Sequence, residues 1–167
     1  MMKKHPFNFT LLSVFALIFL ASCRSVDNSI QYEPMEPKDR GISFIGRGEL
    51  HGAGEEKIEE GGLVIDNQED WDDLMAKMNK VNNVSDGFER QGVNFEEETI
   101  IACFDKVEST GGYEFEVKQV IEKTSLIEVH YTVMAPKGPA ITILTQPYHI
   151  VTIRPSTKPV KFFKTVE

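Results

Sequence analysis

Two stretches of strictly alternating side chains restrict the fold of this chain more than any other feature. Over residues 113–119, Tyr, Phe, Val and Gln alternate with Glu and Lys, and the range 127–133 repeats the pattern with His130 among its polar members. Successive side chains of a strand point to opposite faces, so each range predicts a strand with one buried and one solvent-exposed face. Gly111 and Gly112, directly before the first range, predict a tight turn, because glycine tolerates positive φ.

Shorter apolar runs predict the remaining strands, and Pro147, Pro155 and Pro159 mark where several of them end. The run 99–104 is apolar almost throughout, which is typical of a strand buried on both faces. Strands at this spacing, joined by short polar turns, predict an α+β, mostly β fold: an antiparallel sheet of about seven strands that curls or folds into two layers. The other predicted strands open at Ile42 and cover 62–66, 141–144, 148–153 and 160–163.

One amphipathic helix is expected to pack on this sheet. Asn67 is a favourable N-cap, and Asp70 follows it at the spacing of a capping box. Apolar residues then recur on one helical face, which predicts a helix that runs to about Asn79. The residues of that face are Trp71, Leu74, Met75 and Met78.

The segment 46–62, rich in Gly and Glu, is predicted to be a solvated, flexible loop. It lacks the spacing of a phosphate-binding loop, and its five Glu residues would repel an anion. The same acids lack the Asp-x-Asp spacing of a calcium loop, so no metal site is expected there. The five are Glu49, Glu55, Glu56, Glu59 and Glu60.

The first 22 residues have the composition of an export signal. Two Lys residues form a basic leader, the run 7–20 is apolar, and small residues precede Cys23, which indicates a signal peptide rather than a spanning helix. The tetrapeptide Leu-Ala-Ser-Cys that ends at Cys23 resembles a bacterial lipobox. The resemblance implies that the thiol of Cys23 receives diacylglycerol and that the chain is cut just before it. Residues 1–22 are therefore expected to be a lipoprotein signal peptide, and acyl chains such as palmitate to hold Cys23 in the membrane.

Residues 23–40 are predicted to be a lipidated tether, and residues 41–167 a single domain. The tether range is polar, contains Pro34 and Pro37, and shows neither helical nor strand periodicity. Arg24 stands where an Asp retains many Gram-negative lipoproteins in the inner membrane. The expected location is therefore the cell outer membrane, on its periplasmic or surface face. With Cys23 acylated, no second thiol remains for a disulfide with Cys103.

The acidic composition argues against nucleic acid as a ligand. The chain has 18 Lys and Arg against 26 Asp and Glu, a net charge of −8 at pH 7, and signal cleavage would remove two of the Lys residues. Affinity for nucleic acid rests on neutralising backbone phosphates with Lys and Arg. The expected partners are therefore the membrane, through Cys23, and a protein.

The sequence predicts a protein that is not an enzyme and that needs no cofactor. Cys103 could act as a nucleophile with His130 or His149 as base, but its apolar neighbours are typical of a buried, unreactive thiol. Together with His51, these histidines lack the close spacing of metal ligands, and His130 falls on the exposed face of its strand. A catalytic site assembled from distant residues stays open as an alternative.

Five sequence segments occur in a set order between Ile42 and Phe163. They are Gly-Leu-Val-Ile from Gly62, Glu-Asp-Trp-Asp-Asp-Leu from Glu69, Val-Asn-Phe from Val93, Ser-Thr-Gly-Gly-Tyr up to Tyr113, and Thr-Gln-Pro-Tyr-His-Ile-Val from Thr145. In this order, and behind a lipobox, they resemble the PrcB family, bacterial lipoproteins named for a subunit of a cell-surface protease complex. The resemblance makes 41–167 a PrcB-like domain.

The resemblance implies a non-enzymatic accessory or assembly role, with a protein partner such as a protease. The residues expected to contact that partner are Gly111, Gly112 and Tyr113 in the predicted turn, and Pro147 and Tyr148 in the last family segment.

Two other interpretations of these residues remain open. The Gly-Gly-Tyr turn is also typical of a hairpin with a purely structural role. Alternatively, Gly-rich loops at 108–113 and 145–149 on a β scaffold are how chagasin-like inhibitors enter the active-site cleft of a protease.

Overall fold

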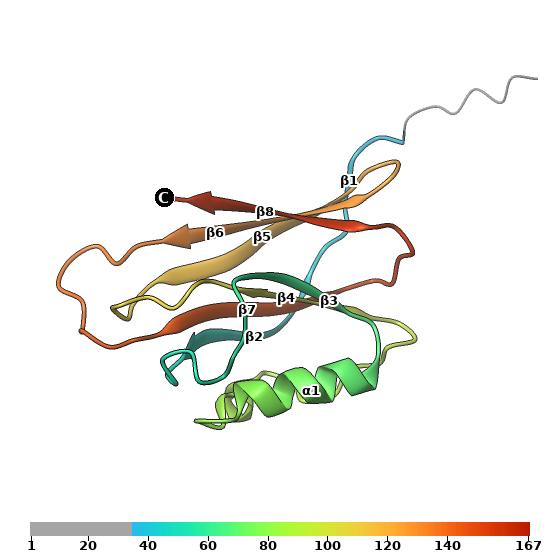
Figure 1. Cartoon of the computed structure of the whole chain (residues 1–167). Coiled ribbons are helices and arrows are strands. Elements are labelled where there is room, and N and C mark those ends of the chain that lie inside the picture. Colours follow the sequence, from blue (N-terminus) through green and yellow to red (C-terminus); the bar gives the residue numbers. More distant parts are fainter. Residues whose placement is uncertain (1–34) are drawn as a thin grey trace, which may run out of the picture. The chain divides into compact units, whose positions relative to one another are not determined.

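The computed structural model describes residues 35–167, which form two β-sheets and one α-helix stacked in three layers (Figure 1). Sheet A has the strand order β1 (Lys38–Asp39), β5 (Glu114–Glu122), β6 (Ile127–Met134) and β8 (Val160–Val166). Sheet B has the order β2 (Ser43–Leu50), β7 (Gln146–Ile153), β4 (Thr99–Phe104) and β3 (Gly61–Ile65). The predicted mostly β fold is thus confirmed in its two-layer form, and neither sheet closes into a barrel.

Sheet B is the middle layer, because its strands β4 and β7 are buried along their whole length. Ala102 and Ile150 on one face belong to the core beneath the helix. Cys103 and Val151 on the opposite face belong to the core between the two sheets. The strand predicted over 99–104, buried on both faces, is confirmed.

The alternating ranges form the inner two strands of sheet A. In β6 every second residue is buried from Ile127 to Val133, and the residues between them are partly exposed. Strand β5 follows the same pattern until its pairing with β6 shifts register between Val117 and Gln119. Both predicted strands are confirmed, and their buried side chains face sheet B.

Helix α1 (Gln68–Met78) begins and ends within one residue of the prediction. The side chain of Asn67 accepts a hydrogen bond from the backbone N–H of Asp70 at 3.0 Å and donates one to the Asp70 carboxylate at 2.7 Å. This capping satisfies a backbone N–H group that the first helical turn leaves unpaired. The residues that α1 buries against sheet B are Trp71, Leu74 and Met78. A short 3₁₀ helix, η1 (Val84–Gly87), follows in the predicted loop.

The strand predicted over 141–144 is not formed. Ile141 is 78% exposed, and the flanking Thr145 makes only an isolated bridge with Glu108. The segment extends past the end of β2, so no neighbouring strand lies beside it to complete a ladder. Its apolar composition therefore does not reflect burial.

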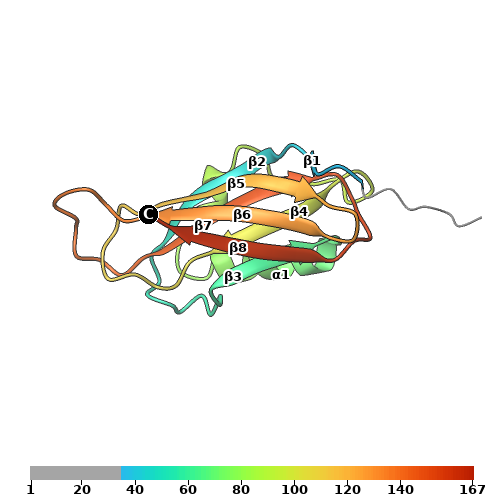
Figure 2. The ribbon, with the colours of Figure 1, turned by 90° about the horizontal axis from the view of Figure 1, so that it is seen from above.

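Sheet A is not entirely antiparallel, as the prediction required, because β8 pairs in parallel with β6. After β7 the chain crosses from sheet B to sheet A and so runs beside β6 in the same direction (Figure 2). The two-residue strand β1, which lies in the range expected to be tether, pairs with Ile121 and Glu122 of β5.

Part of the segment 46–62 is ordered rather than a flexible loop, which corrects the prediction for two of its five Glu residues. Residues 46–50 continue β2, and Gly46 is needed there because a Cβ atom would lie 2.4 Å from the ring of Phe88. Glu49 belongs to this strand. Glu56 is only 2% exposed, and its carboxylate accepts a hydrogen bond from Gly52 N–H at 2.8 Å.

Candidate functional site

Three loops gather at one end of the sandwich, which we call the loop end (Figures 1 and 2). They are the β2–β3 loop (51–60), the β4–β5 loop (105–113) and the β6–β7 loop (135–145). The described chain starts at the opposite end, where the backbone N–H of Met35 donates to Thr124 Oγ1 in the β5–β6 turn at 3.0 Å. The loop end is therefore the end of the domain opposite to Met35, the first described residue.

The β4–β5 and β6–β7 loops are joined by backbone hydrogen bonds. Glu108 and Thr145 exchange two of them, with N···O distances of 2.7 and 3.1 Å. Gly111 N–H donates to the carbonyl oxygen of Ile141 at 3.2 Å, and Thr145 Oγ1 donates to the carbonyl oxygen of Thr110 at 3.1 Å. The two loops therefore form one connected surface.

The Gly-Gly-Tyr turn is held by a carboxylate that sequence reasoning assigned to a flexible loop. Glu49 Oε1 accepts from the backbone N–H groups of Gly112 at 2.8 Å and Tyr113 at 3.3 Å. Gly112 has φ +88°, and a Cβ atom on Gly111 would lie 3.3 Å from Glu49 Oε2. A charged acceptor strengthens such hydrogen bonds, so Glu49 fixes the shape of the turn.

Pro147 and Tyr148 do not lie on the same exposed surface as the turn. Both are buried in β7, and Tyr148 is only 4% exposed. Its ring centroid lies 6.2 Å from those of Phe88 and Phe104, in the core beneath the helix. These two residues support the loop end from within and present no side chain to a partner, which also leaves 146–149 unsuited to entering a protease cleft.

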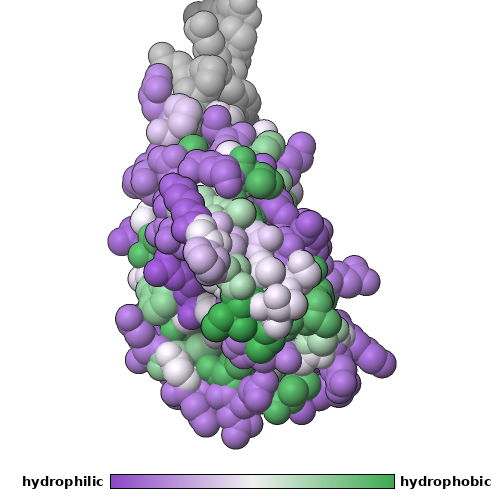
Figure 3. Space-filling view, turned by 90° about the vertical axis from the view of Figure 1, so that its left-hand side faces the viewer, coloured by the Kyte–Doolittle hydropathy of each residue, from purple (hydrophilic) through white to green (hydrophobic). Residues whose placement is uncertain are grey.

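Four exposed apolar side chains of the loop end form what we call the apolar tip. Ile141 is 78% exposed, Leu144 48%, Ile143 43% and Val107 38%. Figure 3 looks onto this end and shows hydrophobic residues between the polar ones. The sequence held a signal for this feature, the apolar run 141–144, which was instead interpreted as a strand.

Cys103 and His149 occupy paired positions of β4 and β7 but lack the environment of a catalytic pair. Cys103 is fully buried, and burial raises the pKa of its thiol to about 12. The predicted burial of this cysteine is confirmed, and a thiol with this pKa is not ionised at neutral pH. His130 lies on the outer face of sheet A, as predicted, beside Glu128.

His149 links the two sheets through a buried hydrogen bond. Its Nδ1 accepts from the backbone N–H of Val117 in β5 at 2.7 Å, and the residue is 4% exposed. Because Nδ1 is the acceptor, the proton of the neutral ring is on Nε2. Burial, with a smaller contribution from the nearby charge of Arg47, lowers the pKa of His149 from 6.5 to about 4. No local pattern along the chain predicts that His149 links the two sheets.

One continuous segment of the chain, which includes Cys103 and His149, matches a known family. Residues 99–154 match the sequence model of the family described as PrcB C-terminal. These residues belong to the PrcB family. No curated protein and no solved structure matches the chain.

The PrcB match covers the structural elements that build the loop end. It runs from the first residue of β4 to one residue beyond β7 and includes the Gly-Gly-Tyr turn, the β6–β7 loop and His149. Glu49 in β2 and the β2–β3 loop lie outside the matched range. The loop end is thus built partly from the PrcB segment and partly from Glu49 and the β2–β3 loop, which lie outside that segment.

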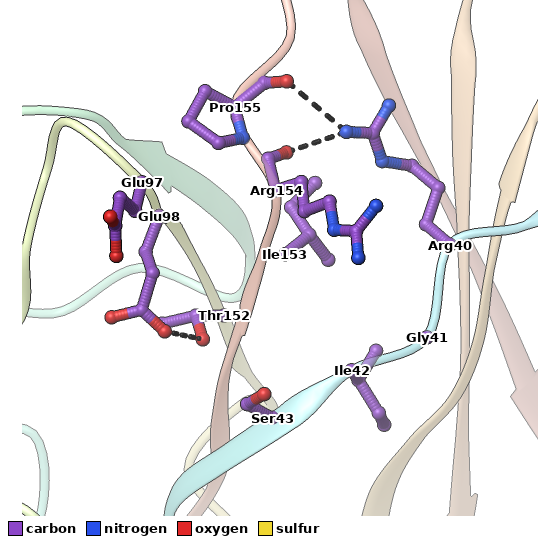
Figure 4. Close-up of a pocket in the computed structure, with 10 residues that line it drawn as sticks. All are labelled: Arg40, Gly41, Ile42, Ser43, Glu97, Glu98, Thr152, Ile153, Arg154 and Pro155. Atoms are coloured by element: carbon purple, nitrogen blue, oxygen red, sulfur yellow. Dashed lines mark hydrogen bonds between the residues drawn. The ribbon is translucent and has the colours of Figure 1, made fainter.

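A groove of about 610 Å³ lies at the opposite end of the domain, between residues 40–43 and 152–155 (Figure 4). The guanidinium group of Arg40 donates to the carbonyl oxygens of Arg154 at 2.7 Å and Pro155 at 3.1 Å, and it pairs with Glu122 at 2.7 Å. These bonds fasten the start of the described chain to β5 of sheet A and to the segment that follows β7 of sheet B.

Within residues 35–167, no group of three or more His, Cys, Asp or Glu side chains is arranged to hold a metal ion. The helices of this part of the chain are all too short or too polar to cross a membrane.

Removing the Glu49 carboxylate is expected to loosen the Gly-Gly-Tyr turn. In Glu49→Ala the N–H groups of Gly112 and Tyr113 lose their acceptor, so their amide hydrogen exchange should accelerate and the free energy of unfolding should fall by about 1 kcal/mol. Glu59→Ala, which removes an exposed carboxylate from the same end, should change neither quantity. Unchanged exchange at both amides in Glu49→Ala would contradict this role.

The low pKa of His149 predicts a loss of stability in mild acid. Between pH 6.5 and pH 4 the unfolded chain binds a proton here that the folded protein does not bind. His149 therefore contributes fully to the free energy of unfolding above pH 6.5, and this contribution is lost as the pH falls toward 4. The loss amounts to about 3 kcal/mol.

Urea unfolding, followed by the fluorescence of the buried Trp71, measures this dependence. His149→Gln keeps a side-chain acceptor but does not titrate, so it should flatten the dependence between pH 6.5 and pH 4.5, whereas His130→Gln should retain it. The prediction fails if the two variants lose stability equally over this range.

Proposed function

We propose that this protein is a lipid-anchored, non-enzymatic interaction module of the bacterial envelope that binds a protein partner through its loop end. The observation that carries the proposal is the apolar tip. Ile141, Ile143 and Leu144 follow one another in nearly unbroken sequence, and each exposes more than two fifths of its surface. Exposed apolar side chains that are grouped in this way mark surfaces that bind other proteins.

The position of the apolar tip agrees with an anchor at Cys23. That residue and the signal peptide lie outside the described residues, so their assignment rests on the sequence. The described chain begins twelve residues after Cys23, at the end of the domain opposite to the loop end. The apolar tip is therefore remote from Met35, where the described chain starts, which supports partner binding by a protein anchored through its N-terminal segment.

The family assignment supports a partner within a protease complex. PrcB names a subunit of such a complex, and the PrcB match includes two of the three loops that build the loop end. We propose an accessory or assembly role in that complex, in which this chain contributes binding and the partner contributes chemistry.

A non-enzymatic role is supported by the state of the two residues best placed to react. The Cys103 thiol has a pKa of about 12, and His149 uses Nδ1 to accept from the Val117 N–H group. A nucleophile and its base need the opposite properties, a lowered thiol pKa and a ring nitrogen whose lone pair is free to accept a proton.

The lipid anchor is tested by exchanging one cysteine at a time. Cys23→Ser should remove the attachment site, so the protein should move from the detergent phase to the aqueous phase in Triton X-114 partitioning. Cys103→Ser is the matched control, because that thiol is buried, and it should stay in the detergent phase. The anchor is disproved if the intact mass of the mature wild-type protein shows no fatty acid.

The binding role is tested at the apolar tip. Ile141→Asp combined with Ile143→Asp should abolish co-purification of the partner from envelope extracts, because two charges replace the apolar contacts, while the exposed loop keeps the fold intact. Leu63→Asp, at a residue 44% exposed on β3, should leave co-purification unchanged. Equal recovery from both variants would exclude the loop end as the binding surface, and an envelope protease in the recovered complex would support the assembly role.

A further inference from the structure

We propose that residues 142–144 form an open β-edge at the loop end, to which an extended segment of the partner adds as a strand. The proposal rests on the proposed function and specifies how the partner binds. Strand addition uses main-chain hydrogen bonds for affinity and alternate side chains for specificity.

The direction of the free backbone groups follows from the pairing of Thr145. In an antiparallel ladder, both backbone groups of one residue point to the same side, and those of the next residue point to the other side. Thr145 directs its N–H and C=O to Glu108. In an extended chain, Leu144 and Thr142 therefore direct theirs to the opposite side.

That opposite side is the position that β2 would occupy if it were longer. The last pair between β2 and β7 is Leu50 with Gln146. Beyond Leu50 the chain turns away, with Glu55 N–H donating to the carbonyl oxygen of Gly52 at 2.9 Å. Within the described chain, no strand of sheet B pairs with residues 142–144 on that side.

The segment itself is held ready for pairing. Residues 139–144 contain no turn or bend, and backbone hydrogen bonds tie Ile141 to Gly111 at one end and Thr145 to Glu108 at the other. Within the described chain, residues 142–144 form no backbone hydrogen bond of their own. Ordering the segment before binding reduces the entropic cost of association.

The charge of the surrounding loops indicates the composition of the incoming segment. Two acids of the three loops, Glu56 and Asp105, are buried, and Asp105 pairs with Lys164. The remaining acids of the loop end outnumber the three lysines of the loops: Glu49, Glu55, Glu59, Glu60 and Glu108. Ile143 and Leu144 add apolar surface on both faces of the edge. The occupant is therefore an extended protein segment in which apolar residues alternate with Lys or Arg, matching the apolar tip and its acidic surroundings.

The first stage of the test maps the partner segment with the full-length chain in its own cells. p-Benzoylphenylalanine replaces Ile141, the adduct formed on illumination is isolated, and the cross-linked partner peptide is identified by mass spectrometry. The matched control carries the same photo-crosslinker at Leu63, which is exposed on the edge strand β3. We expect an adduct at position 141 only, within a segment that alternates apolar and basic residues.

The second stage uses a synthetic peptide of that mapped segment as the probe, titrated against the purified full-length chain. N-methylation of every second residue removes one set of amide donors. One of the two alternate sets should weaken binding about tenfold, while the other should leave it unchanged, because only one set faces the open edge.

The outcomes separate this proposal from the proposed function. Equal effects of the two N-methylated sets, or a mapped segment without alternating apolar and basic residues, overturn strand addition but leave the loop end as the binding surface. An adduct at Leu63 instead of Ile141, or no adduct at Ile141, overturns both.

Discussion

The structure depends on two strands that are buried on both faces. Strands β4 and β7 lie side by side in the middle of sheet B and present apolar side chains to α1 on one face and to sheet A on the other. Each additional layer removes apolar surface from water on its own side of these strands. A polar atom on either strand is costly unless it is paired inside the core, as His149 Nδ1 is with the Val117 N–H.

Sequence reasoning succeeded where neighbours along the chain determine the structure. The alternation over 127–133, the apolar run 99–104 and the cap at Asn67 are local patterns, and each formed the expected element. It failed where pairing with residues far along the chain determines the structure. The segment 141–144 has the composition of a strand, yet whether it pairs depends on where β2 ends. The parallel direction of β8 likewise depends on the crossing between sheets.

The candidate site divides in the same way. The positive φ of Gly112 follows from its residue type, but Glu49, which holds the turn, lies 63 residues earlier in the chain. Tyr148 is an amphipathic ring near a family segment, which suggested a contact residue, and only the packing against Phe88 and Phe104 assigns it to the core. Side-chain exposure, rather than residue type, distinguishes the apolar tip from the apolar core that supports it.

The β-sandwich carries its exposed apolar tip at the loop end, where we propose that a protein partner binds. Hydrogen–deuterium exchange of the full-length chain, compared between its native envelope membranes and the purified state, tests this most directly. The account predicts that exchange in the membranes slows at residues 142–144 and in the adjoining 105–113 loop, with α1 unaffected. Protection centred on α1 or on the outer face of sheet A, with unchanged exchange at 142–144, would contradict it.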